Sequence, residues 1–183
     1  GASGGVPAER AIFGTNVNPE AIIDSTDVFR YYRGGGLTQT FLGFGEFDQY
    51  GNVNVSKFNG IIPGCGGFID IAHKTPKLVF CGSFTAGGAK IEIGGGRLKI
   101  IQEGKYHKLM EKVEQITLNG QEALKKGQDV TYVTERAVFH LTPKGIELLE
   151  YAPGIDIQKD ILDLIPFPVL VSNPKEMDAA LFT

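Results

Sequence analysis

Four residues, Gly64-Cys65-Gly66-Gly67, stand directly before a short apolar segment with helical spacing that starts near Phe68. Glycines let backbone N–H groups approach a ligand closely, and the first turn of a helix carries N–H groups without internal partners. Such a loop can bind an anion or stabilise a developing oxyanion. A tight loop packed against a sheet, with no ligand, explains the same residues equally well. The loop is neither a P-loop nor a dinucleotide fingerprint, because the lysine and the glycine spacing of those motifs are missing.

A second glycine pair, Gly4-Gly5, could also present backbone N–H groups, although a frayed terminus explains it as well. Cys65 at a helix start could be a reactive thiol, but no histidine is placed beside it, which favours a small packing residue. Glu46 follows an apolar run, and the carboxyl ends of strands are where sites in α/β sheets gather. An exposed strand end would account for Glu46 without any chemistry.

The composition is that of an ordinary globular protein, with 183 residues, 42% hydrophobic and 21% charged residues, and a net charge of −3. This charge gives no basic surface for nucleic acid. Cysteine and histidine are few and scattered: Cys65, Cys81, His73, His107 and His140. They predict neither a metal site nor a disulfide framework. No signal peptide and no apolar run of membrane length is visible, so we expect a cytoplasmic protein without membrane contact.

The elements that would position these residues are short. We expect helices starting at Asn18 and spanning residues 28–33, 68–72, 121–126, 156–164 and 174–181. Strands are expected at 37–47, 53–56, 77–81, 90–93, 97–101, 130–141 and 146–151, with hairpin turns at 94–96 and 143–145. Because apolar strands alternate with short helices in the first half, the pattern predicts an α/β sheet with β-hairpin extensions rather than a sandwich.

Several strings, taken together and in order, resemble the C-terminal domain of family I CoA-transferases of the acetate/propionate type. They lie at residues 4–8 (GGVPA), 29–37, 51–58 (GNVNVSKF), 64–69 (GCGGFI), 79–88 (VFCGSFTAGG), 113–117, 132–139 and 152–156. The resemblance covers nearly the whole chain. It implies an open, largely parallel α/β sheet flanked by helices, and a single domain over residues 1–183 that is a fragment of a longer two-domain enzyme.

The resemblance also implies a function. Such enzymes move CoA between short-chain acids through a glutamyl-CoA thioester, and the family's glutamate pattern falls two positions before Gly1. We therefore expect no catalytic residue in this chain and no activity from it alone. Oxyanion and CoA-binding roles map onto Gly4, Gly5, Gly64, Cys65, Gly66 and Gly67. Acyl-CoA, a short-chain carboxylate, an N-terminal CoA-transferase domain and further copies of the protein are the expected partners, with no metal or other cofactor.

Other interpretations stay open at this point. The same fold could serve a hydrolase or lyase component, which would pass the acyl group to water or cleave it. A chain without the glutamate could also be a non-catalytic domain that binds CoA or assembles with a partner. A sugar-phosphate isomerase is a weaker alternative, because no lysine and carboxylate pair marks a phosphate loop. The start at Gly1 fits a segment of a longer polypeptide, a processed chain or a separate subunit.

Overall fold

The centre of the molecule is one six-stranded sheet in a computed structural model that describes residues 1–9, 12 and 14–183. Its strand order is β17-β16-β15-β14-β8-β5. The members are β5 (Gln39–Gly43), β8 (Lys77–Cys81), β14 (Asp129–Val133), β15 (Ala137–Thr142), β16 (Gly145–Tyr151) and β17 (Lys175–Glu176). Three of the five strand pairs are parallel: β5 with β8, β8 with β14, and β16 with β17. The predicted open, largely parallel sheet is confirmed.

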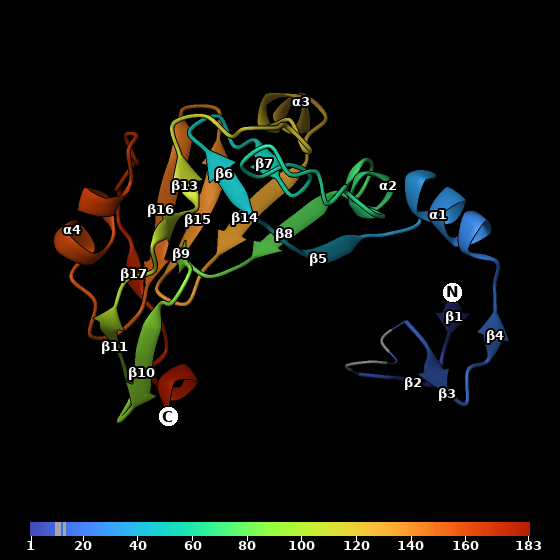
Figure 1. The fold of residues 1–183 in the computed structure, drawn as a ribbon, viewed down its shortest axis with the longest axis horizontal. Helices are drawn as coiled ribbons and strands as arrows, with labels where there is room; N and C mark the ends of the chain where they lie inside the picture. The colour runs from blue at the N-terminus through green and yellow to red at the C-terminus, as the bar shows by residue number, and fades with distance from the viewer. Residues whose placement is uncertain (10–11, 13) are drawn as a thin grey trace.

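Short helices lie between strands along the chain (Figure 1). They are α1 (Ser25–Arg33), α2 (Phe68–Ala72), α3 (Gly120–Lys125) and α4 (Ile157–Asp160). Helix α1 packs against α2 at the β5 end of the sheet. Helix α1 begins where the Asp24 side chain accepts the Thr26 N–H, at 2.8 Å, and ends before Gly34. Helix α3 begins where the Asn119 side chain accepts the Glu122 N–H, at 3.0 Å. Both beginnings use the side-chain capping that the sequence pattern favours.

A small second sheet closes the core. It has the order β13-β6-β7, formed by β13 (Leu109–Met110), β6 (Glu46–Asp48) and β7 (Val53–Asn54). Phe47 of β6 stacks on Tyr132 of β14 with ring centroids 4.2 Å apart, and both side chains are fully buried. The Tyr132 hydroxyl donates to the Gly51 carbonyl at 2.7 Å, which satisfies its only polar atom inside the core. The small sheet is thereby fixed above the strands of the large one.

Two hairpin-like parts extend from this body. Strands β10 (Lys90–Gly94) and β11 (Arg97–Gln102) form the expected hairpin around Gly95-Gly96, and β9 (Thr85–Ala86) pairs with β12 (Tyr106–His107). At the N-terminus, β1 (Ala2–Ser3) pairs with β4 (Ala21–Ile22), and β2 (Val6–Pro7) pairs with β3 (Asn16–Val17). Figure 1 shows these four short strands at the far end of the molecule from β10 and β11.

Several expected boundaries were wrong. No helix starts at Asn18. This residue has a left-handed φ of 51° and lies in the turn between β3 and β4. The strand expected at 37–47 is divided, because the chain bends at Phe44-Gly45 between β5 and β6. The strand expected at 130–141 is two strands, since residues 134–136 turn back. Residues 162–164 and 179–182 form single 3₁₀ turns, and residues 175–176 are the edge strand β17 instead of helix.

Of the helices that the structure describes, none combines the length and apolar character needed to cross a membrane. Within the same residues, no three histidine, cysteine, aspartate or glutamate side chains are grouped as metal ligands.

Candidate functional site

Three parallel strands end level with one another. The pairing of β5, β8 and β14 aligns Gly43 with Cys81 and Cys81 with Val133. The segments that follow these strands carry Glu46, Gly82 and Glu135 and therefore meet at the same edge of the sheet. In an open α/β sheet this is the edge where ligands bind.

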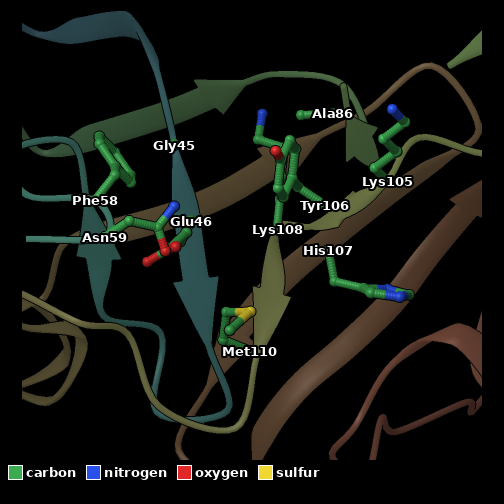
Figure 2. Close-up of a pocket in the computed structure, with 10 residues that line it drawn as sticks. All are labelled: Gly45, Glu46, Phe58, Asn59, Ala86, Lys105, Tyr106, His107, Lys108 and Met110. Carbon is green, nitrogen blue, oxygen red and sulfur yellow. The ribbon is translucent and has the colours of Figure 1, made fainter. Parts of the chain in front are cut away.

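A pocket of about 500 Å³ lies beside this edge (Figure 2). Its walls come from the start of β6, the turn after β7, the end of β9 and the stretch that carries β12 and β13. The lining residues are Gly45, Glu46, Phe58, Asn59, Ala86, Lys105, Tyr106, His107, Lys108 and Met110. Apolar atoms supply most of the surface, Lys105 and Lys108 add positive charge, and Glu46 adds one negative charge. Such a lining fits an anionic ligand with an apolar part.

Lys108 is the most unusual group of this pocket. Its half-buried Nζ atom lies 4.2 Å from the centroid of the Phe44 ring, a cation–π contact. Burial lowers the pKa of Lys108, and the nearby Glu135 carboxylate opposes this shift only in part. Among the residues that the structure describes, no carboxylate oxygen lies within 4.0 Å of this ammonium group. An incoming anion would give Lys108 the charged partner that it lacks.

The turn opposite Lys108 is held by a carboxylate. Glu114 accepts the backbone N–H of Asn59 at 2.7 Å and that of Gly60 at 3.1 Å. These hydrogen bonds lower the pKa of Glu114, the one from Gly60 most strongly. Lys57, 3.4 Å from Glu114, adds an ion pair to the same turn. The pocket wall at residues 57–60 is therefore fixed by polar contacts rather than left as a free loop.

An ion-pair network surrounds the buried side chain of Arg136, the residue that follows Glu135. Its Nη1–H donates to Glu103 Oε1 at 2.5 Å, and its Nε–H donates to Glu135 Oε1 at 2.8 Å. Arg136 also lies over the ring of Phe84 at 4.5 Å, and the Phe84 N–H donates to the other oxygen of Glu135. Burial acts to raise the pKa of Glu103, but the hydrogen bonds from Arg136 and Thr85 outweigh it, so the pKa is lowered. The network fixes Glu135, whose charge acts on Lys108.

The glycine-cysteine loop divides into open and packed positions. Gly64 and Gly66 have left-handed φ values of 86° and 51°, and a side chain at either would meet no atom within 4 Å. A methyl group on Gly67 would lie 2.4 Å from the Phe29 ring, so Gly67 is a packing position against α1. Cys65 is partly buried against the core. The loop therefore offers an open backbone at 64–66 ahead of α2, a helix of five residues.

Gly4 and Gly5 lie elsewhere. A side chain on Gly5 would meet the carbonyl oxygen of Val17 at 2.3 Å, and one on Gly4 would meet Glu20. Both glycines have left-handed φ values, 69° and 72°, and shape the turn between β1 and β2. In the described part of the chain, no hydrogen bond joins them to the 64–67 loop or to the pocket of Figure 2. The oxyanion and CoA-binding roles expected for all six residues stay predictions.

Sequence reasoning noted Glu46 but missed Lys108, Tyr106 and Phe58. Tyr106 belongs to the two-residue strand β12 and Lys108 lies between β12 and β13, so periodicity could not single them out. A positional signal was available only for Glu46, which follows β5, because sites in α/β sheets gather beyond the carboxyl ends of strands.

Comparison with known proteins finds CoA-transferases that are similar to this chain along its whole length. It is 51% identical over all of its 183 residues to acetate CoA-transferase YdiF of Escherichia coli K12, of which it covers 34%. It is 46% identical to caffeate CoA-transferase of Acetobacterium woodii, of which it covers 36%. No protein-family model matches the chain. The chain is thus homologous along its whole length to about a third of these enzymes, and the resemblance predicted from its sequence is confirmed.

Solved structures agree. The apoenzyme of the acyl-CoA transferase YdiF from Escherichia coli O157:H7 superposes with a TM-score of 0.90 and 51% identity, over 93% of this chain and 33% of that one. The same enzyme as a thioester complex with CoA gives a TM-score of 0.91 and 50% identity, over 98% of this chain and 34% of that one. Glutaconate CoA-transferase of Acidaminococcus fermentans, at 20% identity and a TM-score of 0.62, shares the fold.

Proposed function

We propose that this chain is the CoA-handling part of an acyl-CoA:carboxylate CoA-transferase that acts on short-chain acids in the cytoplasm. The observation that carries the proposal is the 51% identity over the whole chain to an acetate CoA-transferase. A structure of an enzyme of that name holds a thioester with CoA and superposes on 98% of this chain. Because the chain spans about a third of these relatives, the rest of the machinery would come from another part of the polypeptide or from another chain.

The proposed chemistry begins with a glutamate that the family pattern places two positions before Gly1. Its carboxylate attacks the carbonyl carbon of an acyl-CoA, the C–S bond breaks, and CoA leaves as a thiolate from a mixed anhydride. The thiolate attacks the glutamyl carbonyl carbon, which releases the first acid as a carboxylate and leaves a glutamyl-CoA thioester. A second carboxylate reverses the two steps and leaves as the new acyl-CoA. Covalent catalysis of this kind replaces one difficult exchange by easier steps, and it needs no redox cofactor.

The open backbone at Gly64 and Gly66 is proposed to stabilise the oxyanions of these steps, together with Gly4, Gly5, Cys65 and Gly67. Backbone N–H groups are well suited to this role because they are fixed before charge develops. The support is geometric, since Gly64 and Gly66 leave space for a ligand to approach.

The pocket of Figure 2 is proposed to bind the carboxylic acid substrate. Its half-buried ammonium group, Lys108, suits a carboxylate, while Phe58, Tyr106 and Met110 suit the short apolar chain. The caffeate enzyme among the relatives acts on an aromatic acid, so the acid-binding part of such proteins accommodates different side chains.

The proposal is tested by incubating acetyl-CoA with propionate or butyrate and measuring the new acyl-CoA. The 183-residue chain should be inactive, and a version extended upstream to include the expected glutamate and the rest of the enzyme should be active. Replacing that glutamate by alanine should abolish the exchange. Release of free CoA without a new acyl-CoA would indicate a hydrolase instead. Binding of CoA with neither reaction would indicate a non-catalytic domain.

A further inference from the structure

We propose that the outer edge of strand β10 binds the same edge of a second copy of this chain, forming an antiparallel four-stranded sheet. The hairpin of β10 and β11 projects from the body of the molecule (Figure 1). All five residues of β10, Lys90–Gly94, are exposed. On one side β10 pairs with β11, and no strand pairs with its other side in the described part of the chain.

The backbone of β10 presents unpaired groups along this edge. The two-residue turn Gly95-Gly96, with φ values of 59° and 75°, makes Gly94 and Arg97 a hydrogen-bonded pair. Since hydrogen-bonded and non-bonded pairs alternate in an antiparallel ladder, Ile91 and Ile93 direct their N–H and C=O groups away from β11. Leu98, opposite Ile93, confirms that this pair directs its backbone groups outward, because the Leu98 N–H donates to the Pro153 carbonyl, away from β10, at 2.8 Å. Within the described residues, no backbone hydrogen bond is formed by the outward groups of Ile91 and Ile93.

The side chains make this edge complementary to itself. A twofold axis at Ile91 pairs the two copies of Ile91 and places Lys90 of each copy opposite Glu92 of the other. These two cross-strand pairs are oppositely charged and occupy non-hydrogen-bonded positions, where side chains lie closest. An axis at Glu92 would instead set the two Glu92 carboxylates against each other. An axis at Ile93 would set Glu92 opposite Gly94, so neither Lys90 nor Glu92 would meet an opposite charge across the axis, and Glu92 would keep only its exposed 3.9 Å contact with Lys99 of its own hairpin. Charge therefore selects the register centred on Ile91.

The apolar side of the hairpin would also continue across the axis. Ile91 and Ile93 lie on the same face as Leu98 and Ile100, their partners in β11. Leu98 is 1% exposed and anchors the hairpin to the core, whereas Ile91 and Ile93 remain 38% and 52% exposed. In the paired state the four isoleucines of the two copies form one continuous row, which removes apolar surface from water.

An open edge strand of this kind is normally protected by short length, proline, a bulge or charged side chains, and β10 carries the opposite charges of Lys90 and Glu92. β10 has no proline, and the irregularity of the hairpin near Lys90 and Ile91 lies in its pairing with β11, where Ile101 is the extra residue. The contact is short, a few residues from each copy, so the association should be weak and should depend on concentration.

Reversal of the two charges tests the proposal. Sedimentation velocity over a range of concentrations would compare the chain with Lys90→Glu, Glu92→Lys and the double variant. We expect a concentration-dependent dimer for the unmodified chain, loss of the dimer in each single variant, and its return in the double variant. A monomer at all concentrations, or a dimer that is equally strong in the two single variants, would overturn the proposal. Loss of the dimer without its return in the double variant would mean that a different partner or register uses this edge.

Ile91→Pro provides an independent check. The Ile91 N–H points away from β11, so proline at this position removes an outward donor and leaves the hairpin ladder intact. We expect this variant to be monomeric with an unchanged far-ultraviolet circular dichroism spectrum. A dimer of undiminished strength in the folded variant would show that β10 is not the contact.

Discussion

The guanidinium of Arg136 and the carboxylate of Glu103 are joined by two hydrogen bonds, Nη1 to Oε1 at 2.5 Å and Nη2 to Oε2 at 3.1 Å. The arginine side chain is fully buried, whereas that of Glu103 is 34% exposed. Arg136 lies in the turn between β14 and β15, and Glu103 precedes β12, which lines the pocket. The pair therefore ties the pocket wall to the central sheet. Planar, two-point contacts of this kind set orientation as well as adding energy.

Replacing Arg136 by methionine should strongly destabilise the fold. The methionine keeps much of the volume but leaves Glu103 and Glu135 without their cation. Breaking one side of a buried ion pair costs about 3–5 kcal/mol, and the exposure of Glu103 argues for the lower end. Urea unfolding monitored by circular dichroism would measure the loss. Arg30→Met is the control, since its pair with Asp27 is exposed and should be worth less than about 1 kcal/mol. Equal effects from the two variants would contradict the account.

Acid should weaken the fold through Glu103. Its pKa is lower in the folded chain than the ordinary value of 4.5, so its stabilisation is complete above that value. The stabilisation is lost as the pH falls through the lowered pKa. We expect the free energy of unfolding to fall more steeply below about pH 4.5 in the unmodified chain than in Glu103→Gln. Parallel pH profiles for the two proteins would show that Glu103 does not contribute.

Lys108 should control the affinity for the carboxylic acid. In an active, extended protein, Lys108→Met removes a charge-assisted hydrogen bond worth about 1.5–3 kcal/mol, so KM for the acid should rise by roughly one to two orders of magnitude. Lys144→Met, on the exposed turn before β16, should leave KM unchanged. Burial lowers the pKa of Lys108 from its ordinary value of 10.5, so Lys108 loses its proton at a lower pH than an exposed lysine does. As the pH rises, binding of the carboxylic acid should therefore weaken earlier than it would with an exposed lysine. An unaltered KM in Lys108→Met would remove the pocket from the proposed function.

Two substitutions in the loop at 64–67 should have different effects, one mainly on activity and the other mainly on stability. Gly66→Ala adds a methyl group in open space but holds alanine at a left-handed φ of 51°, so we expect a folded protein that loses about 1–2 kcal/mol of stability and has reduced turnover. Gly67→Ala drives a methyl group into the Phe29 ring, so we expect a lowered thermal midpoint as the main effect. Differential scanning calorimetry and the exchange assay would be run on both variants. Full activity in folded Gly66→Ala would argue against an oxyanion role for this loop.

The sequence predicts much of the sheet because local patterns determine it. β15 alternates buried Ala137, Phe139 and Leu141 with half-buried neighbours, as expected for a strand. The helix expected at Asn18 failed for a local reason as well. Asparagine tolerates the left-handed region, and Asn18 uses it to turn the chain. The expected helix at 174–181 failed because residues 175–176 pair with β16, a contact that lies outside the local sequence.

The pocket could not be predicted in the same way. Lys108, Phe58 and Glu46 lie far apart in sequence and meet only because β6 pairs with both β7 and β13. The glycine-cysteine loop could be predicted because glycines clustered before a helix indicate a loop from the local sequence alone.

The most direct measurement is the intact mass of the protein after brief incubation with acetyl-CoA and no acceptor acid. For the version extended upstream, the account predicts a covalent adduct equal to CoA less one water, which is lost when the expected glutamate is replaced by glutamine. The 183-residue chain should show no adduct. An extended enzyme that exchanges CoA between acids but never gains this mass would contradict the glutamyl-CoA account.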